Sequence, residues 1–260
     1  MQKYQTKKRF GQHFLHDQHV IERIIQAINP APDLHLLEIG PGLGALTFPL
    51  LKRVEHIHVV DIDRDIIAHL TEMKDPRLTI HEIDALKLNL ADLNIQSTPM
   101  RIVGNLPYNI STPLIFHLLE SSELIEDMHF MLQKEVVDRM SAIPNTKLYG
   151  RLSVMVQYHC ETETLFNVGP SAFNPPPKVD SAIVRLRPWQ KKPYPATDVK
   201  HLRKVVTAAF SLRRKTLRNS LKNTCGVSDL EAADIDPTAR AETLAVEDYV
   251  RLSNYLLTQA

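Results

Sequence analysis

The sequence predicts an α/β protein with a doubly wound, mostly parallel seven-stranded sheet and a small all-α domain at its C-terminal end. Apolar runs of strand length alternate with amphipathic helical patterns through the first part of the chain. Four of these runs end on residues suited to ligand binding, namely Gly40, Asp61, Asp84 and Asn105. Beyond residue 195 only helical patterns follow. Alternation of this kind is typical of parallel sheets covered by helices, and its end marks a second domain.

The first elements establish the alternation. Asp17 is placed to cap an amphipathic helix that ends at Asn29-Pro30. Residues 34–39 form a buried strand, and a glycine turn at 40–44 joins it to the next helix. A glycine turn between strand and helix lets the backbone approach a ligand closely.

The next elements repeat the pattern. Residues 57–60 and 78–83 form strands, and Asp63 caps the helix between them. The fourth strand ends at Ile102-Val103-Gly104 and leads to Asn105. Ser111-Thr112-Pro113 then predicts a helix start, with a hydroxyl cap and a proline in the first helical position.

Three further strands complete the sheet, at residues 128–132, 164–168 and 179–186. The segment 152–158 is apolar enough to be buried. A triple proline at 175–177 cannot join a sheet ladder, so it predicts a stiff loop that presents Phe173 beside the sheet. Residues 188–195 form a linker, and helices are expected at 199–210, 215–221, 228–233 and 242–258.

Size and composition place few limits on function. The chain has 260 residues, 43% hydrophobic and 23% charged, which suits one large domain with a small appendage. We place the domains at residues 1–188 and 189–260.

The sequence contains no run of 18 apolar residues and no secretory signal, and its two cysteines suggest no disulfide framework. We therefore expect a cytoplasmic protein with no membrane partner.

Charge is distributed unevenly, although the net charge is only +1. Residues 199–228 contain eight Lys and Arg and no Asp or Glu, and residues 3–9 are also basic. A charge run is usually a solvated helix face, but one of this length beside a basic arm favours binding of nucleic-acid phosphates. The candidate RNA-binding residues are Arg213, Arg214, Lys215 and Arg218.

The segment Asn105-Leu106-Pro107-Tyr108 leaves the carboxyl end of a strand, where α/β sheets bind ligands. The Asn105 side-chain oxygen and the carbonyl fixed by Pro107 are both acceptors, and together they suit the two hydrogens of an exocyclic amine. Such contacts would free the lone pair of an adenine amine, while Tyr108 stacks on the base. The alternative is an ordinary loop with a packed tyrosine.

The glycine turn is ambiguous by itself. Gly40 and Gly42 fit the dinucleotide fingerprint, with Asp61 lying 21 residues after Gly40, so a nicotinamide enzyme is one interpretation. The acid at Glu38 and the third glycine at Gly44 favour an S-adenosylmethionine loop instead. Asp61 is placed to accept ribose hydroxyls, whereas Asp84 is placed either to accept a cofactor amine or to cap a helix. The histidines lack metal-site spacing, so no metal is expected.

Taken together, these motifs resemble the ribosomal RNA adenine dimethyltransferases, and in particular their bacterial small-subunit members. The resemblance spans nearly the whole chain, and its most specific blocks are residues 105–112 and 173–178. It implies a Rossmann-like methyltransferase fold, with S-adenosylmethionine as co-substrate. It also implies dimethylation of two adjacent adenosines near the 3′ end of 16S rRNA, within the small ribosomal subunit or its precursor, as part of ribosome biogenesis.

The resemblance assigns roles residue by residue. It implies catalytic roles for Asn105, Leu106, Pro107 and Tyr108, with Phe173 stacking on the second face of the adenine. The implied cofactor-binding residues are His13, Leu15, Gly40, Gly42, Asp61, Asp84, Ala85 and Asn105. Relatives often have glutamate at position 61 and asparagine at position 13, so these two contacts differ here. A DNA adenine methyltransferase and a non-catalytic ribosome assembly factor stay open as alternatives.

Overall fold

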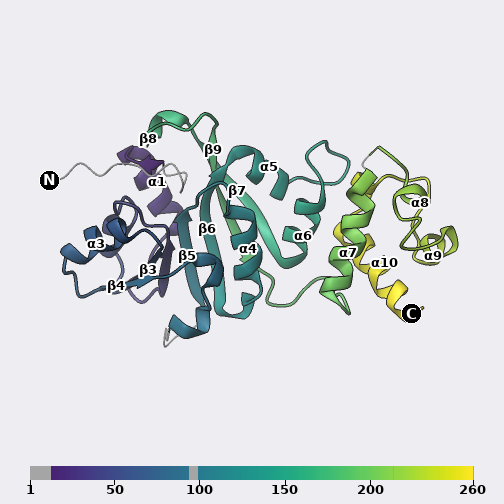
Figure 1. The fold of residues 1–260 in the computed structure, drawn as a ribbon, viewed down its shortest axis with the longest axis horizontal. Coiled ribbons are helices and arrows are strands. Elements are labelled where there is room, and N and C mark those ends of the chain that lie inside the picture. The colour runs from purple at the N-terminus through teal and green to yellow at the C-terminus, as the bar shows by residue number, and fades with distance from the viewer. Residues whose placement is uncertain (1–12, 94–98, 213, 260) are drawn as a thin grey trace. The chain divides into compact units, whose positions relative to one another are not determined.

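The computed structural model describes residues 13–93, 99–212 and 214–259, and Figure 1 shows their fold. A seven-stranded sheet has the order β4-β3-β2-β5-β6-β9-β7, which confirms the predicted architecture. In that order the strands are Leu78–Glu82, Ile57–Asp61, Leu36–Ile39, Met100–Asn105, Ile125–Gln133, Ser181–Pro188 and Cys160–Val168. The first five pair in parallel, and β9 runs antiparallel to β6.

The direction in which strands are added reverses between β2 and β5. From β2 the chain adds β3 and then β4 on one side, after which β5 returns to the other side of β2. The two strands pair in register, with Glu38 opposite Val103, so their carboxyl ends lie side by side. Such a reversal opens a crevice outside the strand ends, which is where open α/β sheets bind ligands.

Helices follow the strands as predicted. The helices along this part of the chain are α1 Gln18–Ile28, α2 Thr47–Leu51, α3 Arg64–Glu72, α4 Ser111–Leu119 and α5 Lys134–Met140. Asp17 caps α1 by accepting hydrogen bonds from the amides of His19 and Val20, which confirms the expected start. The apolar face of α1 is fully buried in the core, because its isoleucines recur at helical spacing.

The start of α4 differs from the prediction. The N-cap residue is Ile110, which has no side-chain cap, and Ser111 is already the first helical residue. Its hydroxyl donates to the carbonyl of Tyr108 at 3.2 Å. The predicted hydroxyl cap is therefore wrong, since Ser111 connects the preceding turn to the helix. The predicted place of Pro113 is also wrong, because it is the third helical residue and not the first.

A two-stranded sheet, which the sequence analysis did not predict, joins two distant segments. Strand β1 (Phe14–Leu15) pairs antiparallel with β8 (Phe173–Asn174), and Leu15 lies opposite Phe173. The residue before β8 is also bonded to the N-terminal segment, because the carbonyl of Ala172 accepts the amide of His16 at 2.9 Å. The segment that carries the triple proline is thus held against the N-terminal segment.

The chain divides by its contacts into two compact units, Met1–Val137 with Glu163–Pro188, and Asp138–Thr162 with Trp189–Ala260. The second unit contains α6 Arg151–His159, α7 Val199–Ala209, α8 Leu217–Ser220, α9 Val227–Ala232 and α10 Val246–Thr258. Helix α10 packs against α6, α7 and α9. The predicted domain division at residue 188 coincides with one of the chain crossings between the units. Within the described ranges, no helix has the length and apolarity to span a bilayer.

Candidate functional site

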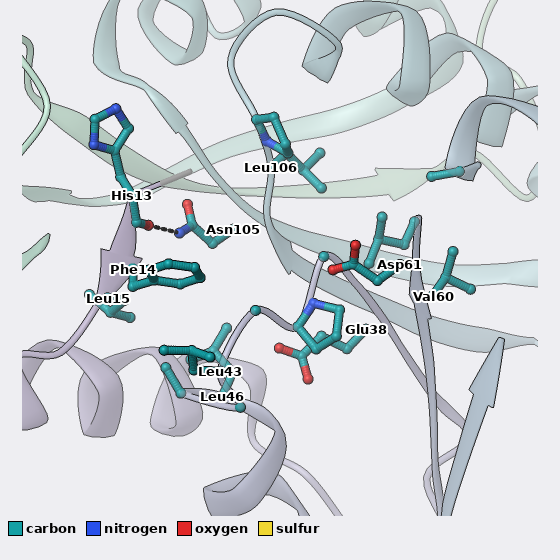
Figure 2. Close-up of a pocket in the computed structure, with 18 of the residues that line it drawn as sticks. His13, Phe14, Leu15, Glu38, Leu43, Leu46, Val60, Asp61, Asn105 and Leu106 are labelled. Carbon is teal, nitrogen blue, oxygen red and sulfur yellow. Dashed lines mark hydrogen bonds between the residues drawn. The ribbon is translucent and has the colours of Figure 1, made fainter. Parts of the chain in front are cut away.

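A cavity of about 1330 Å³ opens at the carboxyl ends of β2, β3, β4 and β5 (Figure 2). Each of these strand ends contributes lining residues, as the recurrence of glycine and polar termini predicted. All predicted cofactor-binding residues line it: His13, Leu15, Gly40, Gly42, Asp61, Asp84, Ala85 and Asn105. The structure therefore brings this set together around one space.

The glycine turn is held in a conformation that L side chains rarely adopt. Gly40, Gly42 and Gly44 all have positive φ angles, of 70°, 54° and 85°. A Cβ atom on Gly44 would lie 2.2 Å from the Phe48 ring, so space as well as backbone conformation requires glycine there. Gly40 turns away from β2 while its amide still donates to Val60 of β3 at 2.9 Å. The backbone thus stays close to the cavity over the whole turn.

Glu38 is a buried carboxyl beneath this turn, with a side chain only 1% exposed. The Thr47 hydroxyl donates to its Oε2 atom at 2.6 Å. Burial raises the pKa of Glu38 to about 7, and the nearby Asp61 carboxylate also raises it. The sequence analysis used Glu38 only as a sign of the loop type, whereas the structure shows that it lines the cavity.

The raised pKa of Glu38 makes the stability of the fold depend on pH. The folded protein keeps this proton up to about pH 7, while the unfolded chain loses it near 4.5. The stability that protonated Glu38 contributes is therefore fully present below pH 4.5 and is lost as pH rises through 7. We expect Glu38→Gln to raise the free energy of unfolding by about 3 kcal/mol at pH 8 and by little at pH 5.

Chemical denaturation of both proteins at pH 5 and pH 8 measures this difference. Glu55→Gln, which changes an exposed acid, serves as the matched control and should leave stability unchanged at both values. Equal stability of Glu38→Gln and the parent protein at pH 8 would show that the buried carboxyl is ionised without cost.

Two carboxylates lie at the ends of β3 and β4. Asp61 is half-buried, and its Oδ1 atom accepts the amide of Asp63 at 2.8 Å, which fixes the side chain at the strand end. Asp84 accepts the amide of Leu86 at 3.0 Å, so it does cap a short 3-10 helix. Its second carboxylate oxygen has no hydrogen-bond partner among the described residues. Capping by one oxygen therefore leaves the other for a ligand.

Asp61→Ala should weaken S-adenosylmethionine binding by about 10- to 100-fold, because hydrogen bonds from ribose hydroxyls to a charged acceptor contribute about 1.5–3 kcal/mol. Isothermal titration calorimetry measures the change directly. Asp65→Ala removes an exposed acid four residues away and should leave binding unaltered. Unchanged affinity of Asp61→Ala would remove this carboxylate from the site.

The turn after β5 holds two acceptors on neighbouring residues, Asn105 and Leu106. The Nδ2 atom of Asn105 donates to the carbonyl of His13 at 3.0 Å, so its Oδ1 atom faces elsewhere (Figure 2). Among the described residues, neither this Oδ1 atom nor the Leu106 carbonyl accepts a hydrogen bond. Leu106 is buried, with its amide bonded to Met131 at 3.2 Å, and Pro107 follows. Both acceptors are therefore fixed in place before any ligand binds.

Tyr108 completes the turn. Its hydroxyl shares a 2.7 Å hydrogen bond with Ser181, which is fully buried on β9. Burial raises the pKa of Tyr108, so the hydroxyl keeps its proton at neutral pH. The half-buried ring lines the cavity. A ring fixed at its far end in this way is suited to stacking on a base.

Phe173 lies elsewhere. Its side chain is 2% exposed and belongs to the hydrophobic core cluster, and it does not line the cavity. The next two residues, Asn174 and Pro175, line the cavity instead. The predicted stacking of Phe173 on a base stays a prediction, and its placement in the core does not favour it.

The predicted RNA-binding residues belong to the second unit. Arg214, Lys215 and Arg218 are exposed, and none of them forms an ion pair within the described part of the chain. Arg213 lies outside the described residues, as does the basic segment 3–9. Their role in binding RNA stays a prediction.

Over the ranges that the structure describes, no three metal-ligating side chains gather into a group.

Comparison with known proteins identifies the family. The family described as "Ribosomal RNA adenine dimethylase" matches residues 3–258. "Ribosomal RNA small subunit methyltransferase A" of Pseudomonas aeruginosa is 57% identical over 256 residues, covering 97% of this chain and 95% of that protein. A solved dimethyladenosine transferase from Plasmodium falciparum has a TM-score of 0.80 and 29% identity, covering 92% of this chain and 96% of the other. The solved 23S rRNA methyltransferase ErmE has a TM-score of 0.69 and 28% identity, covering 94% of this chain and 99% of the other.

These similarities extend over both units, because the matched residues run from the basic N-terminal segment to the end of α10. They agree with the cavity, where a glycine turn, two carboxylates and a fixed pair of acceptors converge. They also confirm the resemblance that the motifs indicated. The chain belongs to the ribosomal RNA adenine dimethylase family.

Proposed function

We propose that this enzyme dimethylates the exocyclic amines of two adjacent adenosines near the 3′ end of 16S rRNA, within the small ribosomal subunit or its precursor. Its co-substrate is S-adenosylmethionine, as the family assignment establishes. The proposal rests on the relative from Pseudomonas aeruginosa, whose name specifies the small subunit. That relative is 57% identical to this chain, whereas ErmE is 28% identical. We place the reaction in the cytoplasm and in ribosome biogenesis.

The chemistry follows from the two acceptors beside the cavity. S-adenosylmethionine supplies an electrophilic methyl group on a sulfonium. An adenine amine is a weak nucleophile, because its lone pair is shared with the ring. Hydrogen bonds from both amine hydrogens to Asn105 Oδ1 and the Leu106 carbonyl favour a pyramidal nitrogen with its lone pair freed. The nitrogen then bonds to the methyl carbon as the carbon–sulfur bond breaks, and the resulting ammonium loses a proton.

The reaction also requires the base to leave its stack. Extruding a nucleotide costs a few kcal/mol, and stacking on Tyr108 offsets about 1–3 kcal/mol of this. The second methylation presents an amine with one hydrogen for the two acceptors, so the pocket must accept a monomethyl group in place of the other hydrogen. We propose that residues 1–188 carry this chemistry and that residues 189–260 bind RNA.

We expect the double substitution Arg214→Ala with Lys215→Ala to weaken RNA binding and to flatten its dependence on salt. Each phosphate contact contributes about 0.7–0.9 to the slope of log affinity against log salt, so two lost contacts should lower it by about 1.5. Fluorescence anisotropy at several salt concentrations measures this slope. The control removes Arg53 and Lys74, an exposed pair of the same composition. A slope equal to that of the parent protein would show that these cations do not face RNA.

Labelled methyl transfer to unmethylated small subunits tests the whole proposal. Nucleoside analysis should find dimethyladenosine in 16S rRNA, and large subunits and duplex DNA should receive little label. Label confined to 23S rRNA would favour the activity that the name of ErmE describes, and label in DNA would favour a DNA methyltransferase. Tight binding without any transfer would indicate an assembly factor instead.

A further inference from the structure

Three half-buried histidines lie together on β3 and β4, at the edge of the large sheet. The rings of His58 and His81 are stacked, with centroids 5.3 Å apart and planes inclined by 11°. The ring of His56, directly before β3, meets His58 edge-on at a centroid distance of 4.9 Å. We call His56, His58 and His81 the histidine ladder.

The ladder lies on the face of the sheet that is opposite α3. Side chains alternate between the two faces along a strand. Ile57 and Val59 belong to the hydrophobic core cluster together with Ile66 and Leu70 of α3. His58 lies between those two β3 residues in the sequence, so its ring points to the other face.

A hydrogen bond joins two titratable rings of the ladder. The Nδ1 atom of His58 is 3.0 Å from the Nε2 atom of His81, so one nitrogen donates and the other accepts. This contact holds a single proton, and it is lost when both rings are positively charged. The Nε2 atom of His56 lies 2.8 Å from the Thr79 hydroxyl, which connects the third ring to β4.

The surroundings of the ladder oppose protonation. Burial lowers the pKa of His58 to about 4, and the imidazoles of His56, His81 and His35 lower it further. Burial also lowers the pKa of His81. Within the described ranges, no carboxylate is among the groups whose charge acts on His58.

The elements that pack against β3 are β2, β4, α2 and α3, and their charged residues have other contacts or lie on the other face. Helix α2 contains no charged residue. Glu38 of β2 accepts the Thr47 hydroxyl of α2, and Glu82 of β4 pairs with Arg64 of α3 at 3.0 Å. The remaining titratable residues of α3 belong to a helix on the opposite face: Asp65, His69 and Glu72.

The two strands of the ladder end at the cofactor cavity. His81 lies opposite Val60, and Val60 and Asp61 line the cavity (Figure 2). Asp84, which follows β4, lines it as well. Because β4 is an edge strand, β3 is the neighbour to which it is bonded in this sheet. Weaker pairing of β3 with β4 would therefore displace both carboxylates.

We propose that the histidine ladder is an acid-sensitive element, whose protonation weakens the pairing of β3 with β4 and lowers the affinity for S-adenosylmethionine. In the unfolded chain His58 takes up its proton near pH 6.5, whereas in the folded chain it does so near pH 4. The stability contributed by the neutral ring is therefore fully present above pH 6.5 and is lost as pH falls toward 4. Glu38 has the opposite effect on stability.

Chemical denaturation at pH 7.5 and pH 5 compares the parent protein with two double variants. His58→Phe with His81→Phe keeps a pair of rings, and His58→Gln with His81→Gln keeps a donor and an acceptor. On acidification, the folding equilibrium constant of the parent should fall about 10- to 30-fold more than that of either variant. The control His19→Gln, which removes an exposed histidine of α1, should behave like the parent.

Only the change with pH is compared, so a variant that is less stable at both pH values is still informative. Glu38 is the same in all these proteins, so its contribution cancels. If neither double variant folds, an NMR titration of the parent protein measures the ladder directly. The His58 ring should still be neutral at pH 5.

Calorimetry measures the effect on cofactor binding, whichever RNA is the substrate. Between pH 7.5 and pH 5.5 the parent should lose more S-adenosylmethionine affinity than either double variant. An equal loss of affinity would show that the ladder does not act on the cavity, and this would overturn the proposal. So would an equal pH dependence of stability in parent and variants, or a His58 signal that titrates near pH 6.5.

Discussion

Asn105→Ala should lower the rate of methyl transfer by about 100- to 1000-fold, the loss that removal of one positioned polar group at a reacting centre produces. The substitution removes the side-chain acceptor of Asn105, while the Leu106 carbonyl stays. S-adenosylmethionine binding should fall only modestly, because the glycine turn and the two carboxylates of β3 and β4 are unchanged. Single-turnover transfer and calorimetry measure the two effects separately.

This substitution also breaks the bond from Asn105 to the His13 carbonyl, so a second variant is needed. Asn105→Asp keeps an oxygen acceptor and loses the donor, and it isolates the bond to His13. Asn89→Ala, which removes an exposed amide from another loop, is the control for nonspecific effects. Turnover of Asn105→Ala near that of the parent protein would refute the two-acceptor mechanism.

Gly104→Ala should cost about 3 kcal/mol of folding stability, the upper part of the range for steric overpacking. A Cβ atom at this position would lie 2.4 Å from the Ile39 carbonyl oxygen and 3.1 Å from a methyl carbon of Leu106. Ile39 lies at the end of β2, which is bonded to β5 in the middle of the sheet, so neither backbone can easily move away. Denaturant titration should show a lower midpoint with an unchanged slope.

Gly150→Ala is the matched control, because the nearest atom to its added Cβ would lie 4.0 Å away. It should change stability little. Gly104→Ala should also weaken cofactor binding, since the atoms that must shift directly precede Gly40 and Asn105. If Gly104→Ala were as stable as the parent protein, β2 and β5 would be able to move apart without any loss of folding free energy.

The sheet and most of the cavity were predictable from the sequence because they depend on local patterns. Four of the strands are short, largely apolar runs followed by a glycine or a polar residue that a strand interior would exclude. In parallel strands those ends meet at one edge, which explains why Gly40, Asp61, Asp84 and Asn105 lie together. The spacing of glycines in the first turn likewise reflects a local requirement for positive φ.

Features that depend on distant contacts were not predictable. The pairing of β1 with β8 involves two residues on each side, too few to produce a periodic pattern. That pairing accompanies the burial of Phe173 in the core, whereas the triple proline predicted a loop that presents Phe173 beside the sheet. Ser111 has the residue type of a helix cap, but the turn at Tyr108 takes its hydroxyl instead. The contact between the His13 and Tyr108 rings, whose centroids lie 6.2 Å apart, also arises only when both segments reach the same cavity.

The interleaved path of the chain has a consequence for protein engineering. Because Asp138–Thr162 belongs to the same unit as Trp189–Ala260, stopping synthesis at Pro188 would strip α6 of its partners α7 and α10. Tyr158 of α6, which is buried and whose hydroxyl accepts the amide of Ala196, would lose this cover, and newly exposed apolar surface on α6 would favour aggregation. Chimaeras that exchange helical modules between relatives should therefore transplant both stretches, with junctions near 137, 163 and 188.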